Sequence, residues 1–115
     1  MIADASAVSL DLPASLAKVK LDLLKLYGSR LSRLILFGSC ARNEASFPDS
    51  DIDLAVVLVD PSPNVWSEIS LTADLCSRFN LDFGILLNPF FCSESNFVSS
   101  SSPIYKNILS EGFLL

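Results

Sequence analysis

Residues 51–59, with the sequence DIDLAVVLV, limit the possible folds of this chain more than any other stretch. After two aspartates the stretch is almost continuously apolar, which is typical of a strand that is covered on both faces. Pro61 and Pro63 end it, and apolar side chains then recur at a spacing of about 3.6 over residues 64–79, which predicts a long helix. A strand predicted at residues 81–87 would make this helix a crossover between parallel strands.

The other predicted elements give the order helix, strand, strand, helix, strand, helix, in a chain of the usual length for one domain. The spacing does not decide the relative direction of the first two strands. The elements are a helix over 13–28, a strand over 33–37 that ends at Gly38, a helical turn over 39–43, a loop over 44–50, a serine-rich loop over 92–102, and a helix from Pro103 to Gly112.

The charge of the chain argues against a general nucleic-acid binder. The chain has eight basic and thirteen acidic residues, which gives a formal net charge of −5. Binding to a phosphate backbone requires clustered lysine and arginine, whereas the basic residues here are scattered along the sequence. The charge does not argue against a small phosphate ligand that binds together with a cation.

The cysteine and histidine content excludes two further classes of site. Three separated cysteines and no histidine cannot supply the four ligands of a structural zinc site. The lack of histidine also removes the usual base of a serine or cysteine hydrolase. The odd number of cysteines, the short apolar runs and the lack of a basic N-terminal region favour a soluble, cytoplasmic protein without a membrane span or a secretory signal.

Carboxylates stand at the start of two predicted strands. Asp51 and Asp53 lie two residues apart, so they share one face of their strand. Asp82 is one residue into the next predicted strand, and the three carboxylates would converge if these strands are neighbours. Such a cluster must take up protons or bind cations, and oxygen ligands favour Mg²⁺ over zinc. The alternative is that these aspartates cap turns or are simply solvated.

A glycine-serine turn after the first strand adds a second feature. Gly38 allows the backbone to approach a ligand, and Ser39 opens a helical turn whose N–H groups can hold phosphate oxygens. Neither feature is specific alone. The order strand, glycine-serine, loop, two aspartates, strand, helix, strand and third aspartate is specific as a whole.

In this order the chain resembles a minimal nucleotidyltransferase (MNT) of the DNA polymerase β superfamily, in particular the antitoxins of HEPN–MNT toxin–antitoxin pairs. The resemblance covers about residues 33–112. It rests on Gly38-Ser39, Ala41-Arg42, Glu44-Ala45, Asp49-Ser50-Asp51-Ile52-Asp53-Leu54, Asp82 and the helix Pro103-Ile104-Tyr105-Lys106-Asn107-Ile108-Leu109-Ser110-Glu111-Gly112.

The resemblance implies a nucleotidyltransferase fold, a mixed α/β (α+β) fold with a small mixed sheet packed against helices. The first two strands would run antiparallel. It implies one domain over 1–115, with an N-terminal helix in 1–30, the catalytic strands and crossover helix in 33–87, and a loop and helix in 88–115. ATP would be the substrate and two Mg²⁺ ions the cofactors. The implied site consists of the nucleotide-binding residues Gly38, Ser39 and Arg42 and the catalytic, metal-binding residues Asp51, Asp53 and Asp82.

The resemblance also implies an acceptor. The enzyme would transfer AMP to a hydroxyl group of a HEPN toxin, with Asp82 helping to activate that hydroxyl, and would not act on nucleic acid. Two alternatives stay open: an inactive antitoxin that neutralises its partner by contact, and a small-molecule adenylyltransferase. A homo-oligomer is also open. The pair Phe90-Phe91 and the residues Phe113-Leu114-Leu115 are expected either in the core or at the partner interface.

Overall fold

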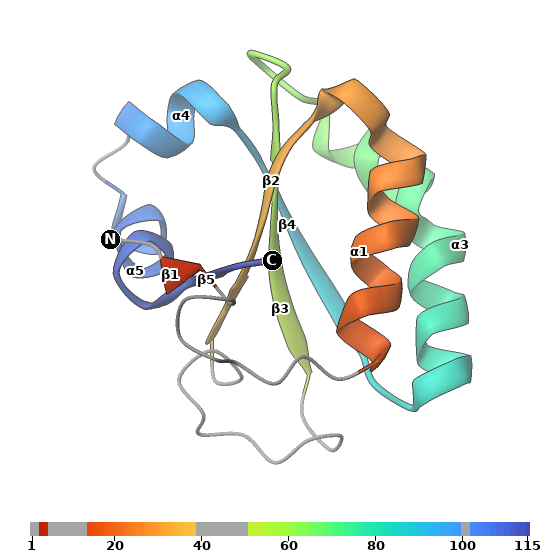
Figure 1. Ribbon diagram of the computed structural model, residues 1–115. Helices are drawn as coiled ribbons and strands as arrows, with labels where there is room; N and C mark the ends of the chain where they lie inside the picture. Colours follow the sequence, from red (N-terminus) through yellow and green to blue (C-terminus); the bar gives the residue numbers. More distant parts are fainter. Residues whose placement is uncertain (1–2, 5–13, 39–50, 100–101) are drawn as a thin grey trace.

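A five-stranded mixed sheet in the order β1-β5-β2-β3-β4 forms the centre of the computed structural model (Figure 1). The structure describes residues 3–4, 14–38, 51–99 and 102–115. Its elements are β1 (Ala3–Asp4), α1 (Ala14–Tyr27), a 3-10 turn η1 (Gly28–Arg30), β2 (Leu31–Phe37), β3 (Ile52–Leu58), α3 (Val65–Phe83), β4 (Leu87–Ser93), α4 (Glu94–Ser99), α5 (Pro103–Glu111) and β5 (Phe113–Leu114).

The strand pairing matches the predicted mixed sheet. β3 lies between β2 and β4, antiparallel to the first and parallel to the second. The helix α3 is therefore the predicted crossover, and the antiparallel direction of the first pair, which the spacing left open, agrees with the resemblance. β5 adds to the other edge of β2 in antiparallel orientation, and β1 pairs with β5 in parallel.

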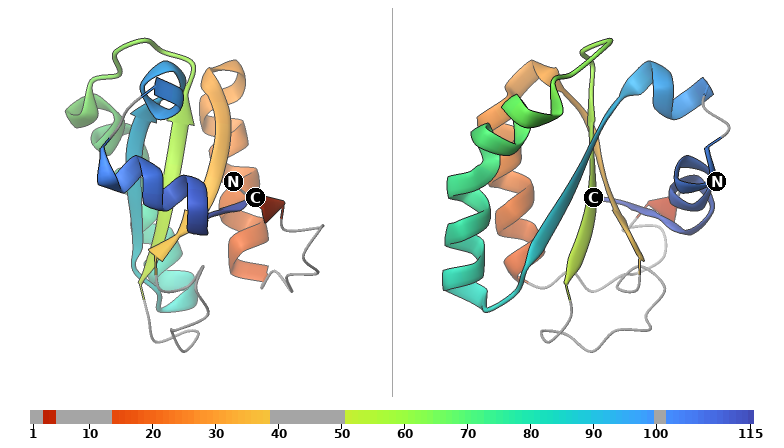
Figure 2. Two further views of the ribbon diagram at one scale, coloured as in Figure 1. Left: turned by 90° about the vertical axis from the view of Figure 1, so that its left-hand side faces the viewer. Right: turned by 180° about the vertical axis from the view of Figure 1, so that it is seen from behind.

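Helices cover both faces of the sheet, as the apolar sequence of β3 predicts. Figure 1 and the right-hand view of Figure 2 show α1 and α3 on one face and α4 and α5 on the other. Alternate residues of β3 enter two separate core clusters: Leu54 and Val56 pack on the α1–α3 side, and Ala55 and Val57 on the other side. No described helix has the length and apolar character needed to cross a membrane.

The strand predicted over 81–87 is wrong. The helix α3 continues through Phe83 and ends at Gly84, whose φ of +67° is left-handed and whose N–H donates to Asn80 O over 2.8 Å. β4 begins only at Leu87 and runs through Pro89. Because β4 is an edge strand, one side of it needs no backbone donor, so the proline does not interrupt the sheet.

The predictions for the C-terminal third differ in outcome. The serine-rich segment 92–102 is not all loop, because it contains the end of β4 and the helix α4. The helix between Pro103 and Gly112 is confirmed as α5. Of the apolar pair and the C-terminal residues, Phe91 is buried in the core, and Phe90, Phe113, Leu114 and Leu115 are partly buried against the two core clusters. The alternative of a partner interface stays a prediction.

A hydrogen-bonded ionic cluster joins α1, η1 and α3 at the end of the sheet where β2 begins and β3 has just ended. Arg30 donates to both carboxylate oxygens of Asp60 at 3.1 and 3.2 Å and to Glu68 Oε2 at 2.6 Å. Tyr27 donates its hydroxyl to Glu68 Oε1 at 3.2 Å. Burial and the Glu68 carboxylate raise the pKa of Tyr27, so its hydroxyl stays a donor at neutral pH. We call these four residues the Arg30 cluster.

Replacing Glu68 should destabilise the protein through this cluster. The side chain of Glu68 is only 5% exposed, and Glu68→Ala leaves Arg30 with one partner fewer and Tyr27 without an acceptor. We expect a loss of about 2 kcal/mol in the free energy of unfolding, measured by urea denaturation. Asp74→Ala is the matched control: it removes an exposed carboxylate 3.6 Å from Arg78 on the same helix and should change stability by less than about 0.5 kcal/mol. Equal losses in the two variants would contradict a structural role of the Arg30 cluster.

Candidate active site

Asp51 and Asp53 lie where β3 enters the sheet. Asp53 pairs with Phe37, the last residue of β2, so the end of one strand and the start of the other meet here. Alternation along β3 places Asp53 on the same face as Ala55, which is the face covered by α4 and α5. Asp51 is exposed and Asp53 half-buried, so both carboxylates remain near solvent.

Asn88 lies beside this pair of carboxylates. On β4 it is the register partner of Asp53, and its Nδ2 lies 3.4 Å from Asp51 Oδ2 and 3.5 Å from Asp53 Oδ1. A single nitrogen in reach of both side chains means that the two aspartates share a face, as their spacing predicted. The sequence did not predict Asn88 as a site residue, because it comes just after the strand predicted over 81–87 and is followed by a proline. The apolar residues that follow, Phe90 to Cys92, were the available signal for a strand there.

Asp82 does not join this pair. It lies in the last turn of α3, exposed, and lines a groove of about 470 Å³ whose lining also includes Lys18 and Lys25 of α1. Within the described residues no three histidine, cysteine, aspartate or glutamate side chains are grouped so that they could hold a metal ion. The predicted convergence of three carboxylates is therefore wrong. The physical reason is the longer helix, which takes Asp82 out of the sheet.

Gly38 was predicted to allow a close approach to its backbone, and the structure shows such an approach. Its φ is +76°, a left-handed conformation that other residues adopt with strain. A Cβ at this position would overlap Asp53 Oδ2, so the glycine makes room for the carboxylate. The sequence had suggested a close approach of a ligand; the neighbour that the structure shows is part of the site itself. Ser39 and Arg42 lie outside the described residues.

A cavity of about 350 Å³ adjoins the site on the α5 side. It is lined by Phe37, Gly38, Ile104, Asn107 and Glu111. The cavity thus connects the glycine at the end of β2 to one side of α5. Its lining combines two apolar side chains with an amide and a carboxylate, a mixture that suits a neutral ligand with hydroxyl or amino groups.

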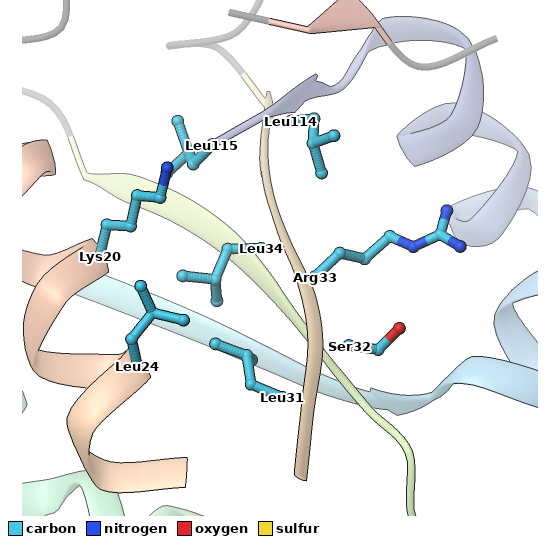
Figure 3. A pocket seen from close by; sticks show the side chains of 8 residues that line it. All are labelled: Lys20, Leu24, Leu31, Ser32, Arg33, Leu34, Leu114 and Leu115. Atoms are coloured by element: carbon cyan, nitrogen blue, oxygen red, sulfur yellow. The ribbon is translucent and has the colours of Figure 1, made fainter. Parts of the chain in front are cut away.

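Another cavity, of about 490 Å³, lies at the opposite end of β2 and is separate from the site. Figure 3 shows Leu24, Leu31 and Leu34 on one side of β2, with Arg33 on the other, and Lys20 reaching from α1 toward the C-terminus. The cavity borders the part of β2 that precedes its pairing with β5. Its described lining contains no acidic side chain and two basic ones, Lys20 and Arg33, whose charge disfavours a cation.

The donor set at Asp51 and Asp53 fits a magnesium ion. Mg²⁺ in nucleotide enzymes is usually held by one or two carboxylates together with substrate phosphates. The described residues supply two carboxylates and the amide of Asn88. Thiol chemistry does not fit on this face of the sheet, because burial raises the pKa of Cys92 to about 11 and keeps the thiol protonated.

Comparisons with known proteins agree with this geometry. Residues 16–97 match the family described as nucleotidyltransferase domain. A protein of Methanocaldococcus jannaschii whose name proposes a protein adenylyltransferase is 32% identical over 90 residues, covering 77% of this chain and 82% of the relative.

Solved structures share the fold at lower sequence identity. A chain from a toxin–antitoxin complex with AMP-PNP has a TM-score of 0.57 at 20% identity, covering 84% of this chain and 69% of that chain. A Sulfolobus solfataricus protein whose name proposes a nucleotidyltransferase has a TM-score of 0.50 at 20% identity, covering 91% and 89%. With the family match, these likenesses confirm the predicted fold class.

Substituting Gly38 should affect the site more than substituting another left-handed glycine. Gly38→Ala introduces both backbone strain and overlap with Asp53, whereas Gly84→Ala introduces the strain alone, because nothing lies within 4 Å of a Cβ there. We expect the loss in unfolding free energy to be larger for Gly38→Ala by at least about 1 kcal/mol. Only this variant should also weaken binding of Mg²⁺-ATP in calorimetry. Similar losses and unchanged nucleotide binding would mean that Gly38 serves only as a strand end.

Proposed function

Because the chain belongs to the nucleotidyltransferase domain family, we propose that it transfers AMP from ATP to a hydroxyl group of a partner protein. The predicted enzyme class, a nucleotidyltransferase, is confirmed by the family match. The observation that carries the finer proposal is the carboxylate pair Asp51 and Asp53, brought together at the end of the sheet beside Gly38.

Asp51 and Asp53 bind the cation that accompanies the triphosphate. Two unit charges about 4 Å apart repel by roughly 4 kcal/mol at an effective dielectric constant of 20, so a divalent cation between such groups is favoured. When bound, Mg²⁺ would neutralise phosphate charge and bring the attacking and leaving oxygens into line. Gly38 keeps Asp53 in place by leaving room for its carboxylate. Ser39 and Arg42 remain predicted partners of the triphosphate.

The cavity beside Gly38 receives the nucleoside part of ATP. The carboxylate of Glu111 on its wall would repel phosphates but can accept hydrogen bonds from ribose hydroxyls or an amino group. Phe37 and Ile104 provide apolar surface for a base. This assignment places the phosphates toward Asp51 and Asp53 and leaves the exposed side of the pair for the acceptor.

The reaction is a substitution at the α-phosphorus. The acceptor oxygen forms a bond to the α-phosphorus, the bond from that phosphorus to its bridging oxygen breaks, and pyrophosphate leaves with the electron pair. The proton of the hydroxyl passes to water. The sequence suggested Asp82 as the group that would take up this proton, but Asp82 lies on α3. The amide of Asn88, which lies beside the carboxylate pair, cannot take up a proton.

The acceptor we propose is a HEPN-type toxin, which makes this chain an antitoxin. Support comes from the name of the Methanocaldococcus jannaschii relative and from the shared fold of the toxin–antitoxin chain solved with AMP-PNP. A second candidate is an antitoxin that acts by contact alone. The observation in its favour is Asn88, a neutral residue at the place where a third carboxylate was expected.

Transfer should depend on Asp53 but not on every aspartate. We expect Asp53→Asn to lower the rate of AMP transfer by at least roughly a hundredfold, because it weakens binding of the cation that stabilises the transition state. The assay is intact-mass measurement of a HEPN toxin incubated with the protein, ATP and Mg²⁺, in which whole AMP units are added. Asp74→Asn, an exposed aspartate on α3, should leave the rate unchanged.

The same assay separates the candidates. Mass increments that disappear with EDTA and with Asp53→Asn support the transferase. Neutralisation of the toxin by the wild-type protein without any mass increment would establish the contact-only antitoxin instead. Label from α-phosphate-labelled ATP on small molecules but not on the toxin would point to a small-molecule adenylyltransferase.

A further inference from the structure

We propose that Asn88 is the third metal-site residue of this protein, with two alternative roles for its amide. Without a cation, the amide N–H₂ group holds Asp51 and Asp53 together. With a divalent cation bound to the pair, the amide turns and offers its carbonyl oxygen. The proposal rests on the function proposed above, since it assumes that the carboxylate pair binds a cation.

The sheet fixes the position of Asn88. It stands opposite Asp53 in a parallel register that continues without a shift from Ile52 and Leu87 to the ends of both strands. The N–H of Ile52 donates to Leu86 O at 2.9 Å, which anchors the start of β3 directly to the segment before Asn88. The amide is therefore held by a backbone framework on the same face as the carboxylates.

The amide lies between the two carboxylates. One nitrogen lies 3.4 Å from Asp51 and 3.5 Å from Asp53, near the long limit of a hydrogen bond, so it contacts both without being tightly held by either. The last torsion of an asparagine side chain is broad and roughly two-fold, so exchange of its N–H₂ and carbonyl ends costs little. A group at this position can serve the carboxylates as a donor and a cation as an acceptor.

A neutral third residue changes the charge balance of the site. The pair carries two negative charges, which one divalent cation neutralises; a third carboxylate would add two further repulsions of the kind described above. An amide instead stabilises the cation-free form through its N–H groups. The expected consequence is a weaker cation affinity than three carboxylates would give, together with a more stable cation-free protein.

Substitutions at Asn88 test both roles by readouts that do not involve transfer. We expect Asn88→Ala to weaken Mn²⁺ binding about tenfold in calorimetry without nucleotide. Asn88→Asp should tighten Mn²⁺ binding on the order of tenfold and lower the thermal midpoint in EDTA, because three carboxylates then repel one another. The proposal thus predicts opposite effects of Asn88→Asp: the variant stabilises the cation-bound protein and destabilises the cation-free protein.

Asp82→Asn is the matched control, because it neutralises the carboxylate that the sequence alone would have placed at the site. It should leave both Mn²⁺ affinity and the midpoint in EDTA unchanged. Wild-type affinity in Asn88→Ala, weaker binding in Asp82→Asn, or no Mn²⁺ binding by the wild-type protein would each overturn the proposal. If the Asn88 variants change Mn²⁺ affinity as expected but the wild-type protein transfers no AMP, the role of Asn88 stands and the transferase function is rejected.

Discussion

Burial of β3 between two layers of helices is the constraint on which the rest of the structure depends. Every side chain from Leu54 to Leu58 is buried, and the strand has a paired neighbour on each edge. An unpaired carboxylate inside such a strand would lose several kcal/mol of hydration. Charged side chains can therefore lie only where the strand leaves the core, which is where Asp51 and Asp53 are found.

The two ends of the β2–β3 pair have different tasks. At one end the Arg30 cluster connects α1, η1 and α3 through a buried carboxylate. At the other end Gly38 and Asp53 fit together without space for an extra atom. Because a slip of one residue would turn every side chain of a strand to the opposite face, contacts that fix the register at one end also preserve the site at the other.

The face of the sheet decides which elements can contribute to the site. Asp53 and Asn88 point to the side of α4 and α5, and α5 lines one side of the cavity beside Gly38. The helix α3 covers the opposite face (Figure 2), and Asp82 belongs to the last turn of this helix. The combination of two carboxylates and one amide at the candidate site is therefore a consequence of where α3 ends, and it carries less negative charge than three carboxylates would.

The sequence by itself determined what depends on local periodicity and on single backbone positions. The apolar run of β3, the helices α1 and α5, the shared face of Asp51 and Asp53, and the end of β2 at Gly38 all follow from spacing or residue type. Only the tertiary structure decided where the third strand lies and which residue it brings to the site. A strand can pass through Pro89 because β4 is at the sheet edge, and that position results from pairing between residues far apart in the sequence.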